Sequence, residues 1–169
     1  LTMIKGMRRD FMSAIVDARK DGPYRSLADF INRIDPQFQK AKLIAPLIYV
    51  GAFDGLGYNR AEMIAGLDGL LESSEFSFQS ADLQPVMEQR NEYPLSFRLA
   101  KEREYLGIYL SGHPISQYAA LRSQLHALKV SQLRPKERVT IILMINRIRR
   151  INTKRTHEPM AFVTASDES

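Results

Sequence analysis

The spacing of apolar residues changes once along this chain, and that change limits the possible folds more than any other feature. From about residue 9 to residue 71, and again from residue 95 to residue 128, apolar side chains recur at intervals of three and four, the period of an amphipathic helix. Two later segments, Val139 to Ile145 and Met160 to Ala165, are rich in β-branched and apolar residues instead. Because two strands alone are marginal in water, we expect a mainly α protein that ends inside an unfinished β domain.

Glycine and proline divide the helical part into helices of ordinary length. Helices are predicted over residues 9–20, 26–35, 41–50, 59–71, 95–110 and 118–128. Ser26 and Asn59 are expected to cap the second and the fourth, since their side-chain oxygens accept hydrogen bonds from free backbone amides. Pro46 would cost ~3 kcal/mol inside a helix, so the third helix is expected to begin late, with Pro46 in its first turn.

The distribution of charge is more informative than the net value of +5. Residues 1–60 hold ten basic and six acidic side chains, whereas residues 61–104 hold four basic and nine acidic ones. Residues 122–157 hold ten basic side chains against Glu137 alone. Two basic regions around an acidic one indicate two surfaces for a polyanion and one for a different partner, with a merely solvated basic face as the alternative.

Several classes of protein are excluded or disfavoured. No apolar run reaches the ~20 residues that span a bilayer, and the first residues lack the pattern of a signal peptide. The absence of cysteine excludes disulfides and thiolate metal sites, and it suits a cytoplasmic protein. Aspartates such as Asp10, Asp17 and Asp54 lack the paired arrangement that holds two Mg²⁺ ions, so no catalytic residue is predicted. His113, between a glycine and a proline, predicts a helix-ending turn rather than a metal ligand.

Two glycine-containing hairpins are the candidate sites for duplex DNA. A hairpin before a helix turns backbone amides outward, and the helix dipole favours an anion there, so a phosphate is the expected ligand. The candidates are Lys5, Gly6, Arg8 and Arg9 in the first hairpin, and Gly51, Gly55, Gly57, Asn59 and Arg60 in the second. Arg8 stands where a second glycine is usual, so the first hairpin is expected to depend on charge. A plain helix connection is the alternative for the second.

Three stretches resemble one family. They are residues 51–60, the run KEREYLGIYLSGHP over residues 101–114, and RRINTK over residues 149–154 followed by PMAFVT over residues 159–164. In this order they resemble the bacterial DNA polymerase III alpha subunit, the C-family replicase. The resemblance implies tandem helix-hairpin-helix elements that hold the duplex behind the active site, then an OB-fold near the single-stranded template. It also implies that the polymerising carboxylates and their Mg²⁺ lie upstream in the parent enzyme, so this segment should be inactive alone.

The resemblance divides the chain into four parts. They are a tandem helix-hairpin-helix over residues 1–71, an acidic linker over 72–94, connecting helices over 95–128, and the first part of an OB-fold over 129–169. In the last part, backbone contacts to nucleic acid are expected from Arg147, Arg149, Arg150, Lys154 and Arg155. Phe162 is either a core residue, the favoured interpretation, or a stacking platform. Isoleucines spaced by three predict a bulge that curves the first strand.

The linker holds a candidate docking segment for another protein. Gln79 and Leu83 resemble the glutamine and apolar residue with which the family docks onto the sliding clamp, although Asp82 stands where an apolar residue is usual. The expected partners are therefore double-stranded DNA, single-stranded DNA, the sliding clamp and other replisome subunits. A plain acidic linker is the alternative for this segment. For the whole chain, the alternatives are a protein-docking module or a helix-hairpin-helix protein of DNA repair.

Overall fold

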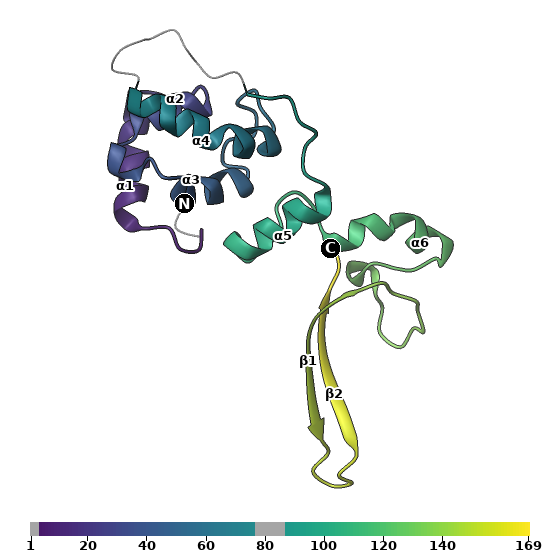
Figure 1. The fold of residues 1–169 in the computed structure, drawn as a ribbon. Coiled ribbons are helices and arrows are strands. Elements are labelled where there is room, and N and C mark those ends of the chain that lie inside the picture. The colour runs from purple at the N-terminus through teal and green to yellow at the C-terminus, as the bar shows by residue number, and fades with distance from the viewer. Residues whose placement is uncertain (1–3, 77–86) are drawn as a thin grey trace. The chain divides into compact units, whose positions relative to one another are not determined.

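The computed structural model describes residues 4–76 and 87–169 (Figure 1). The chain divides into two compact units, residues 1–110 and residues 111–169. The first unit is helical and the second contains the sheet, as the change in apolar spacing predicted. The mainly α fold with two terminal strands is thus confirmed. Residues 95–110 belong to the first unit, together with both hairpins.

Over residues 4–76 and 87–110, the first unit contains five α-helices and two short 3-10 helices. Its elements are α1 (Arg9–Ala18), η1 (Arg19–Asp21), α2 (Leu27–Arg33), η2 (Pro36–Phe38), α3 (Ala41–Tyr49), α4 (Arg60–Phe76) and α5 (Leu95–Leu106). Ser26 caps α2 as predicted, because its Oγ accepts a hydrogen bond of 3.0 Å from the Asp29 amide. The Asp29 carboxylate accepts in turn from the amide of Arg25, at 2.9 Å.

Pro46 lies inside α3 and not in its first turn, so the prediction of a late helix start is wrong. The helix begins at Ala41 and continues through Pro46 to Tyr49. Its other face carries Ile44, Leu47 and Ile48, which are almost completely buried. Burying one such side chain is worth ~1.5–3 kcal/mol, so three of them outweigh a proline penalty of ~3 kcal/mol.

The region predicted as an acidic linker is partly structured at both ends. Helix α4 continues to Phe76, five residues beyond the end expected at residue 71. Met87, where the described chain resumes, is buried against α4. A Cβ added to Gly66 would lie 3.1 Å from Met87 Cγ, so this glycine lets the returning chain approach the helix closely.

The core of the first unit joins its helices through aromatic side chains. Phe11 of α1 packs on Phe38 with ring centroids 5.2 Å apart, and Phe30 of α2 contacts Phe53 edge to face at 4.9 Å. Phe53 belongs to the glycine-rich second hairpin and is 4% exposed, so the hairpin contributes a ring to the core. The ring of Phe53 therefore holds the second hairpin against α2.

The second unit has short helices followed by a two-stranded antiparallel sheet. Its elements are η3 (Pro114–Tyr118), α6 (Ala119–Gln124), η4 (Val130–Gln132), β1 (Met144–Asn152) and β2 (Pro159–Ser166). The first strand begins at Met144, so the predicted strand over residues 139–145 was placed too early. Of that earlier segment, Ile141 forms an isolated bridge with Leu128. The predicted bulge is confirmed between Ile145 and Arg147.

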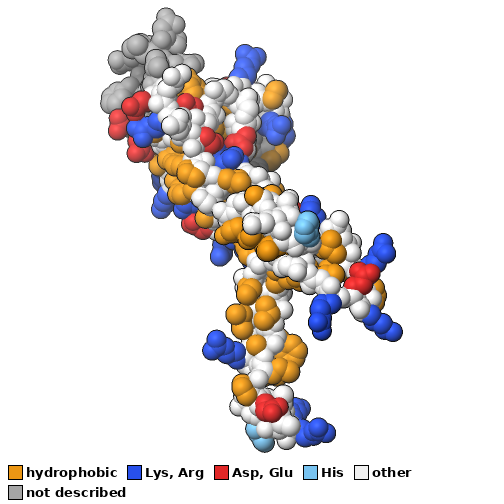
Figure 2. Space-filling view, turned by 90° about the vertical axis from the view of Figure 1, so that its right-hand side faces the viewer, with side chains coloured by type: hydrophobic (Ala, Val, Ile, Leu, Met, Phe, Trp, Pro, Cys, Tyr) orange, Lys and Arg blue, Asp and Glu red, His pale blue; other side chains and the backbone are white. Residues whose placement is uncertain are grey.

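Apolar side chains remain exposed on both strands of this sheet. Figure 2 shows them in orange along the strand pair in the lower part of the view, with lysines and arginines in blue beside them. They are Ile145, Ile148, Met160, Phe162 and Val163. Such a surface, together with the bulge, is consistent with the beginning of a barrel of the OB type. In the described ranges, no helix combines the length and apolar character needed to cross a membrane.

Candidate nucleic-acid interface

The first hairpin presents its predicted residues to solvent. Gly6 has φ +81°, a conformation that favours glycine, and the turn is closed by a hydrogen bond of 3.2 Å from the Met7 amide to the Ile4 carbonyl. The Lys5 amide donates to the Tyr105 carbonyl of α5 at 2.7 Å, which anchors the hairpin. The predicted residues Lys5, Gly6, Arg8 and Arg9 are all exposed. The four residues that the sequence predicted as DNA contacts therefore lie together and exposed at the first hairpin.

An acidic residue that sequence reasoning did not assign to the site lies at the start of α1. Asp10 accepts hydrogen bonds from the Phe11 amide at 2.9 Å and from Arg8 Nε at 3.1 Å. The Arg8 guanidinium is the main cause that holds the pKa of Asp10 below its usual range. Arg8 is therefore paired with a carboxylate at the helix end where a phosphate was expected. The sequence signal for this ion pair was the position of Arg8 two residues before Asp10.

The glycines of the second hairpin have two different roles. Gly51, Gly55 and Gly57 have φ of +80°, +88° and +99°. A Cβ on Gly51 would lie 2.6 Å from Asp54 Oδ2 and 2.9 Å from Arg60 Cζ, so Gly51 makes room for an internal ion pair. A Cβ on Gly55 or Gly57 would meet no other described atom within 4 Å, and both glycines are exposed. These two remain candidates for close approach of a DNA backbone.

Arg60 lies inside the fold, which corrects its assignment as a phosphate contact. The residue is 3% exposed. Its guanidinium pairs with Asp54 at 2.7 Å and with Glu102 at 3.0 Å, and it donates to the Tyr49 carbonyl at 3.0 Å. Hydrogen bonding from Asp54 is the largest cause that raises the pKa of Arg60. The charge of Arg60 thus ties the second hairpin, α3 and α5 together.

Asn59 caps α4 as predicted, in a reciprocal arrangement with Glu62. Asn59 Oδ1 accepts from the Glu62 amide at 2.9 Å, and Glu62 Oε2 accepts from the Asn59 amide at 2.8 Å. The amide of Arg60, the first residue of α4, donates to Glu92 Oε2 at 3.2 Å. The start of α4 is therefore occupied by side chains of this chain, including one from residues 87–94.

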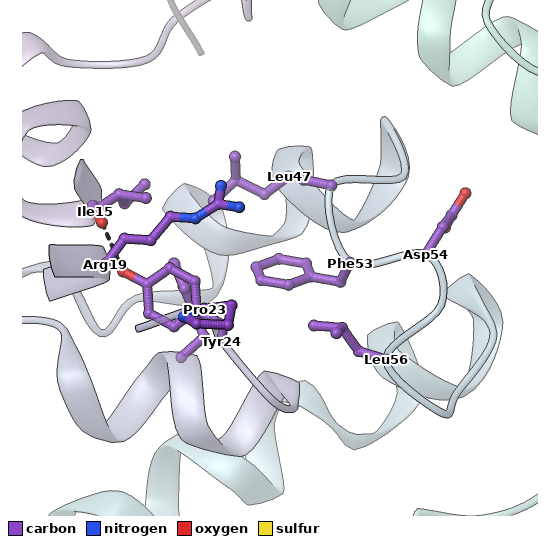
Figure 3. Close-up of a pocket in the computed structure, with 10 residues that line it drawn as sticks. Ile15, Arg19, Pro23, Tyr24, Leu47, Phe53, Asp54 and Leu56 are labelled. Carbon is purple, nitrogen blue, oxygen red and sulfur yellow. Dashed lines mark hydrogen bonds between the residues drawn. The ribbon is translucent and has the colours of Figure 1, made fainter. Parts of the chain in front are cut away.

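An apolar pocket of about 370 Å³ lies beside the second hairpin (Figure 3). Phe53 and Leu56 of the hairpin line it from one side, and Tyr24 lines it from the other. The Tyr24 hydroxyl donates to the Ile15 carbonyl at 2.7 Å, which fixes the position of its ring. Tyr24 also packs edge to face on Phe30, at 5.0 Å. Since Phe30 also contacts Phe53, these rings link the second hairpin to α2 and, through Tyr24, to α1.

The sheet of the second unit brings two predicted arginines beside an aromatic ring. Arg147 pairs across the strands with Thr164, and Arg149 pairs with Phe162. All four line a shallow cavity of about 240 Å³ on one face of the sheet. Phe162 is 57% exposed, so within the described chain it is not the core residue that was favoured. An exposed ring beside two cations is an arrangement suited to stacking a base.

The other predicted residues are less closely grouped. Arg150 pairs with Ala161 in the register, one position after Arg149 and so on the opposite face. Lys154 and Arg155 lie in the exposed turn between the strands. Gln79 and Leu83, the candidates for clamp docking, fall outside the described residues.

Across residues 4–76 and 87–169, no cluster of side chains suited to a metal ion is found. His113 Nδ1 accepts a hydrogen bond of 3.3 Å from the Ile115 amide, so His113 caps the start of η3, where a helix-ending turn was predicted.

Comparison with known proteins gives matches along the whole chain. The family described as a helix-hairpin-helix motif matches residues 1–63. The DNA polymerase III subunit alpha of Bacillus subtilis (strain 168) is 35% identical over 100% of this chain and 16% of that protein. The subunits of Streptococcus pyogenes and Staphylococcus epidermidis (strain ATCC 12228) are 32% and 33% identical, each over 99% of this chain and 16% of the relative. This chain therefore spans about a sixth of the length of these curated relatives. The resemblance that the three sequence stretches indicated is confirmed.

Proposed function

We propose that this chain holds duplex DNA behind the active site of a replicase. It corresponds along its length to part of the bacterial DNA polymerase III alpha subunits. The observation that carries this proposal is the first hairpin, where Lys5, Gly6 and Arg9 are exposed together at the start of a helix within the matched motif. Phosphate contacts of this kind position a duplex without reading its sequence. A cytoplasmic location follows, because bacterial DNA lies there.

The second hairpin contributes to the same grip through its backbone. Gly55 and Gly57 are open to solvent and lack side chains that would keep a phosphate away. Arg60 supports this turn from inside and does not contact DNA itself. Binding by the first unit is thus driven by the cations of the first hairpin and by close approach of the DNA backbone to Gly55 and Gly57.

The sheet is proposed to contact single-stranded DNA. Arg147 and Arg149 supply charge for the backbone, and Phe162, opposite Arg149, supplies a flat surface for a base. Removing one stacking contact costs ~1–3 kcal/mol per base. A Phe162→Ala variant should therefore weaken binding of an oligothymidine by at least about fivefold, while duplex binding stays unchanged.

The test of duplex binding is a titration of a labelled duplex at two salt concentrations. We expect weak affinity without sequence preference that falls as salt rises, because phosphate binding releases counterions. Lys5→Glu with Arg8→Glu should weaken it for every sequence. Lys20→Glu with Arg25→Glu changes the charge equally at exposed positions outside both hairpins, and serves as the control. Affinity that is independent of salt, or equal loss in both double variants, would refute the hairpin grip.

Docking onto the sliding clamp through Gln79 and Leu83 is a second proposed function. The support is the position of this segment after the hairpins and its likeness to the family pattern. A pull-down with the clamp compares the native chain with a Gln79→Ala/Leu83→Ala variant. Loss of capture is expected, and unchanged capture would show that the segment was wrongly chosen. Polymerisation, with its Mg²⁺, is proposed to belong to other parts of the full-length enzyme.

A further inference from the structure

Residues 88–93 cross the second hairpin at the start of α4. Asn59 Nδ2 donates to the Arg90 carbonyl at 2.7 Å, and the Arg90 amide donates to Glu62 Oε1 at 3.2 Å. The Arg60 amide donates to Glu92 Oε2. This segment, here called the strap, is therefore hydrogen-bonded to the residues that begin α4.

The chemistry of these contacts resembles that expected for DNA. A helix start offers free amides and a positive dipole end, which a phosphate oxygen or a carboxylate satisfies equally well. Glu92 places a carboxylate oxygen on the first amide of α4, and Glu62 adds a second negative charge beside it. A DNA backbone that approached this helix end would meet two carboxylates before it met an amide.

The strap is held firmly at its ends and weakly in its middle. Met87 is buried against α4 at one end. At the other end, Tyr93 packs on Phe97 with ring centroids 4.4 Å apart, and on Tyr49 at 6.3 Å. Residues 88–91 between them are exposed and Glu92 is half-buried, and polar hydrogen bonds attach this stretch to the hairpin. Opening the middle would thus cost a few hydrogen bonds and no buried apolar contact.

We propose that the strap is an internal competitor for the second hairpin, in which Glu92 occupies the place of a DNA phosphate until duplex DNA displaces it. This inference rests on the proposed function of the hairpins. In the absence of DNA, the strap satisfies the amides of α4 and screens the site from weak anions. A duplex that binds both hairpins displaces it, so DNA held by one hairpin alone is released more readily.

The strap itself provides a matched pair of variants. Glu92→Gln removes one charge at the helix start, and Glu88→Gln removes one charge from the same segment, where Glu88 pairs with exposed Arg90. Long-range electrostatics change equally in both. Glu92→Gln should tighten duplex binding about twofold to fivefold, the range expected for a charge at a helix terminus. Glu88→Gln should change it less than twofold.

A second measurement uses the native chain and needs no variant. Amide hydrogen exchange of Arg90 and Arg60 is followed by NMR with and without a saturating duplex. Displacement of the strap predicts that the Arg90 amide loses protection while the Arg60 amide stays protected by phosphate.

The outcomes separate the strap from the hairpin function. Salt-dependent duplex binding with equal effects of the two variants, and an unchanged Arg90 amide, would show that the strap is a permanent cap, and the proposed function would stand. If neither the native chain nor Glu92→Gln binds duplex, the proposed function fails and the competition fails with it. If Glu92→Gln does not fold, the exchange measurement on the native chain decides.

Discussion

The Arg60 guanidinium lies 3.0 Å from Glu102 Oε1, and the Glu102 carboxylate has no exposed surface. The two residues are far apart in sequence, and their pairing joins the start of α4 to α5. Glu102 Oε2 also accepts a hydrogen bond of 2.6 Å from the amide of Leu110. A buried carboxylate of this kind holds three segments of the first unit in register.

Removing one partner of this buried pair should be far more damaging than replacing both. Glu102→Ala leaves the guanidinium of Arg60 without its buried partner, and a loss of about 3–5 kcal/mol in unfolding free energy is expected. An Arg60→Met/Glu102→Leu double variant should lose less, because no uncompensated charge remains inside. Chemical denaturation followed by circular dichroism measures both. A double variant as unstable as Glu102→Ala would show that the hydrogen bonds, and not the charges, dominate.

Two glycines of the second hairpin should respond differently to the same substitution. Gly51→Ala adds a Cβ that collides with the ion pair of Asp54 and Arg60, so it should cost several kcal/mol of stability. Gly55→Ala enters open space and should cost only about 1 kcal/mol for its positive φ. The Gly55 variant should instead weaken duplex binding. Thermal unfolding and a DNA titration of both variants test whether Gly51 serves stability and Gly55 serves binding. Equal unfolding midpoints of the two variants would contradict this difference.

Asp10 should limit the affinity of the first hairpin. Asp10→Asn removes the carboxylate that pairs with Arg8 and accepts from the start of α1. Duplex affinity should rise about twofold to fivefold at low salt, because Arg8 is released for phosphate contact. Asp17→Asn removes an exposed aspartate that pairs with Lys20 and should leave affinity nearly unchanged. If the two variants bind alike, the pairing with Arg8 has no role in binding.

Acid should weaken the second unit within a defined range of pH. Burial raises the pKa of Asp167, but hydrogen bonds from Ser169 and from the Val130 amide outweigh it and lower that pKa to about 2. Hydrogen bonding from Arg122 lowers the pKa of Glu168 to about 2. Because both pKa values are lower in the folded state, these groups stabilise it fully above about pH 5, and the effect is lost between about pH 4 and pH 2. Amide exchange of the second unit across this range measures the change, and an Asp167→Asn/Glu168→Gln variant should be less sensitive to pH.

Local patterns were sufficient to predict much of this fold, and distant contacts were not. Ser26 and Asn59 were identified as caps because a cap acts within three residues of itself. Pro46 was misplaced because the burial that overcomes its penalty comes from other helices. Helical spacing and local caps therefore predicted where these helices form, and tertiary burial decided that α3 continues through Pro46.

The candidate site shows the same division. Lys5 and Arg9 were predicted to be exposed beside a hairpin, and they are. Arg60 was predicted to face DNA because it follows a capping residue, but its partner Glu102 could not be found from spacing alone. Glu92 was hidden for the same reason, since it reaches the start of α4 from a segment that has no helical pattern in the sequence.

The bulge in β1 has a consequence for how this strand tolerates change in length. Asn146 lies at the irregularity between Ile145 and Arg147, and its Nδ2 donates to Ser166 Oγ at 2.9 Å. Deleting that one residue would restore regular pairing without a change of face, because Ile145 and Arg147 already pair with adjacent residues of β2. A one-residue deletion in the regular part of β1 would instead turn the side chains on one side of it to the opposite face. The bulge is thus the position at which β1 should accept the loss of a residue while Arg147 and Arg149 keep their orientation.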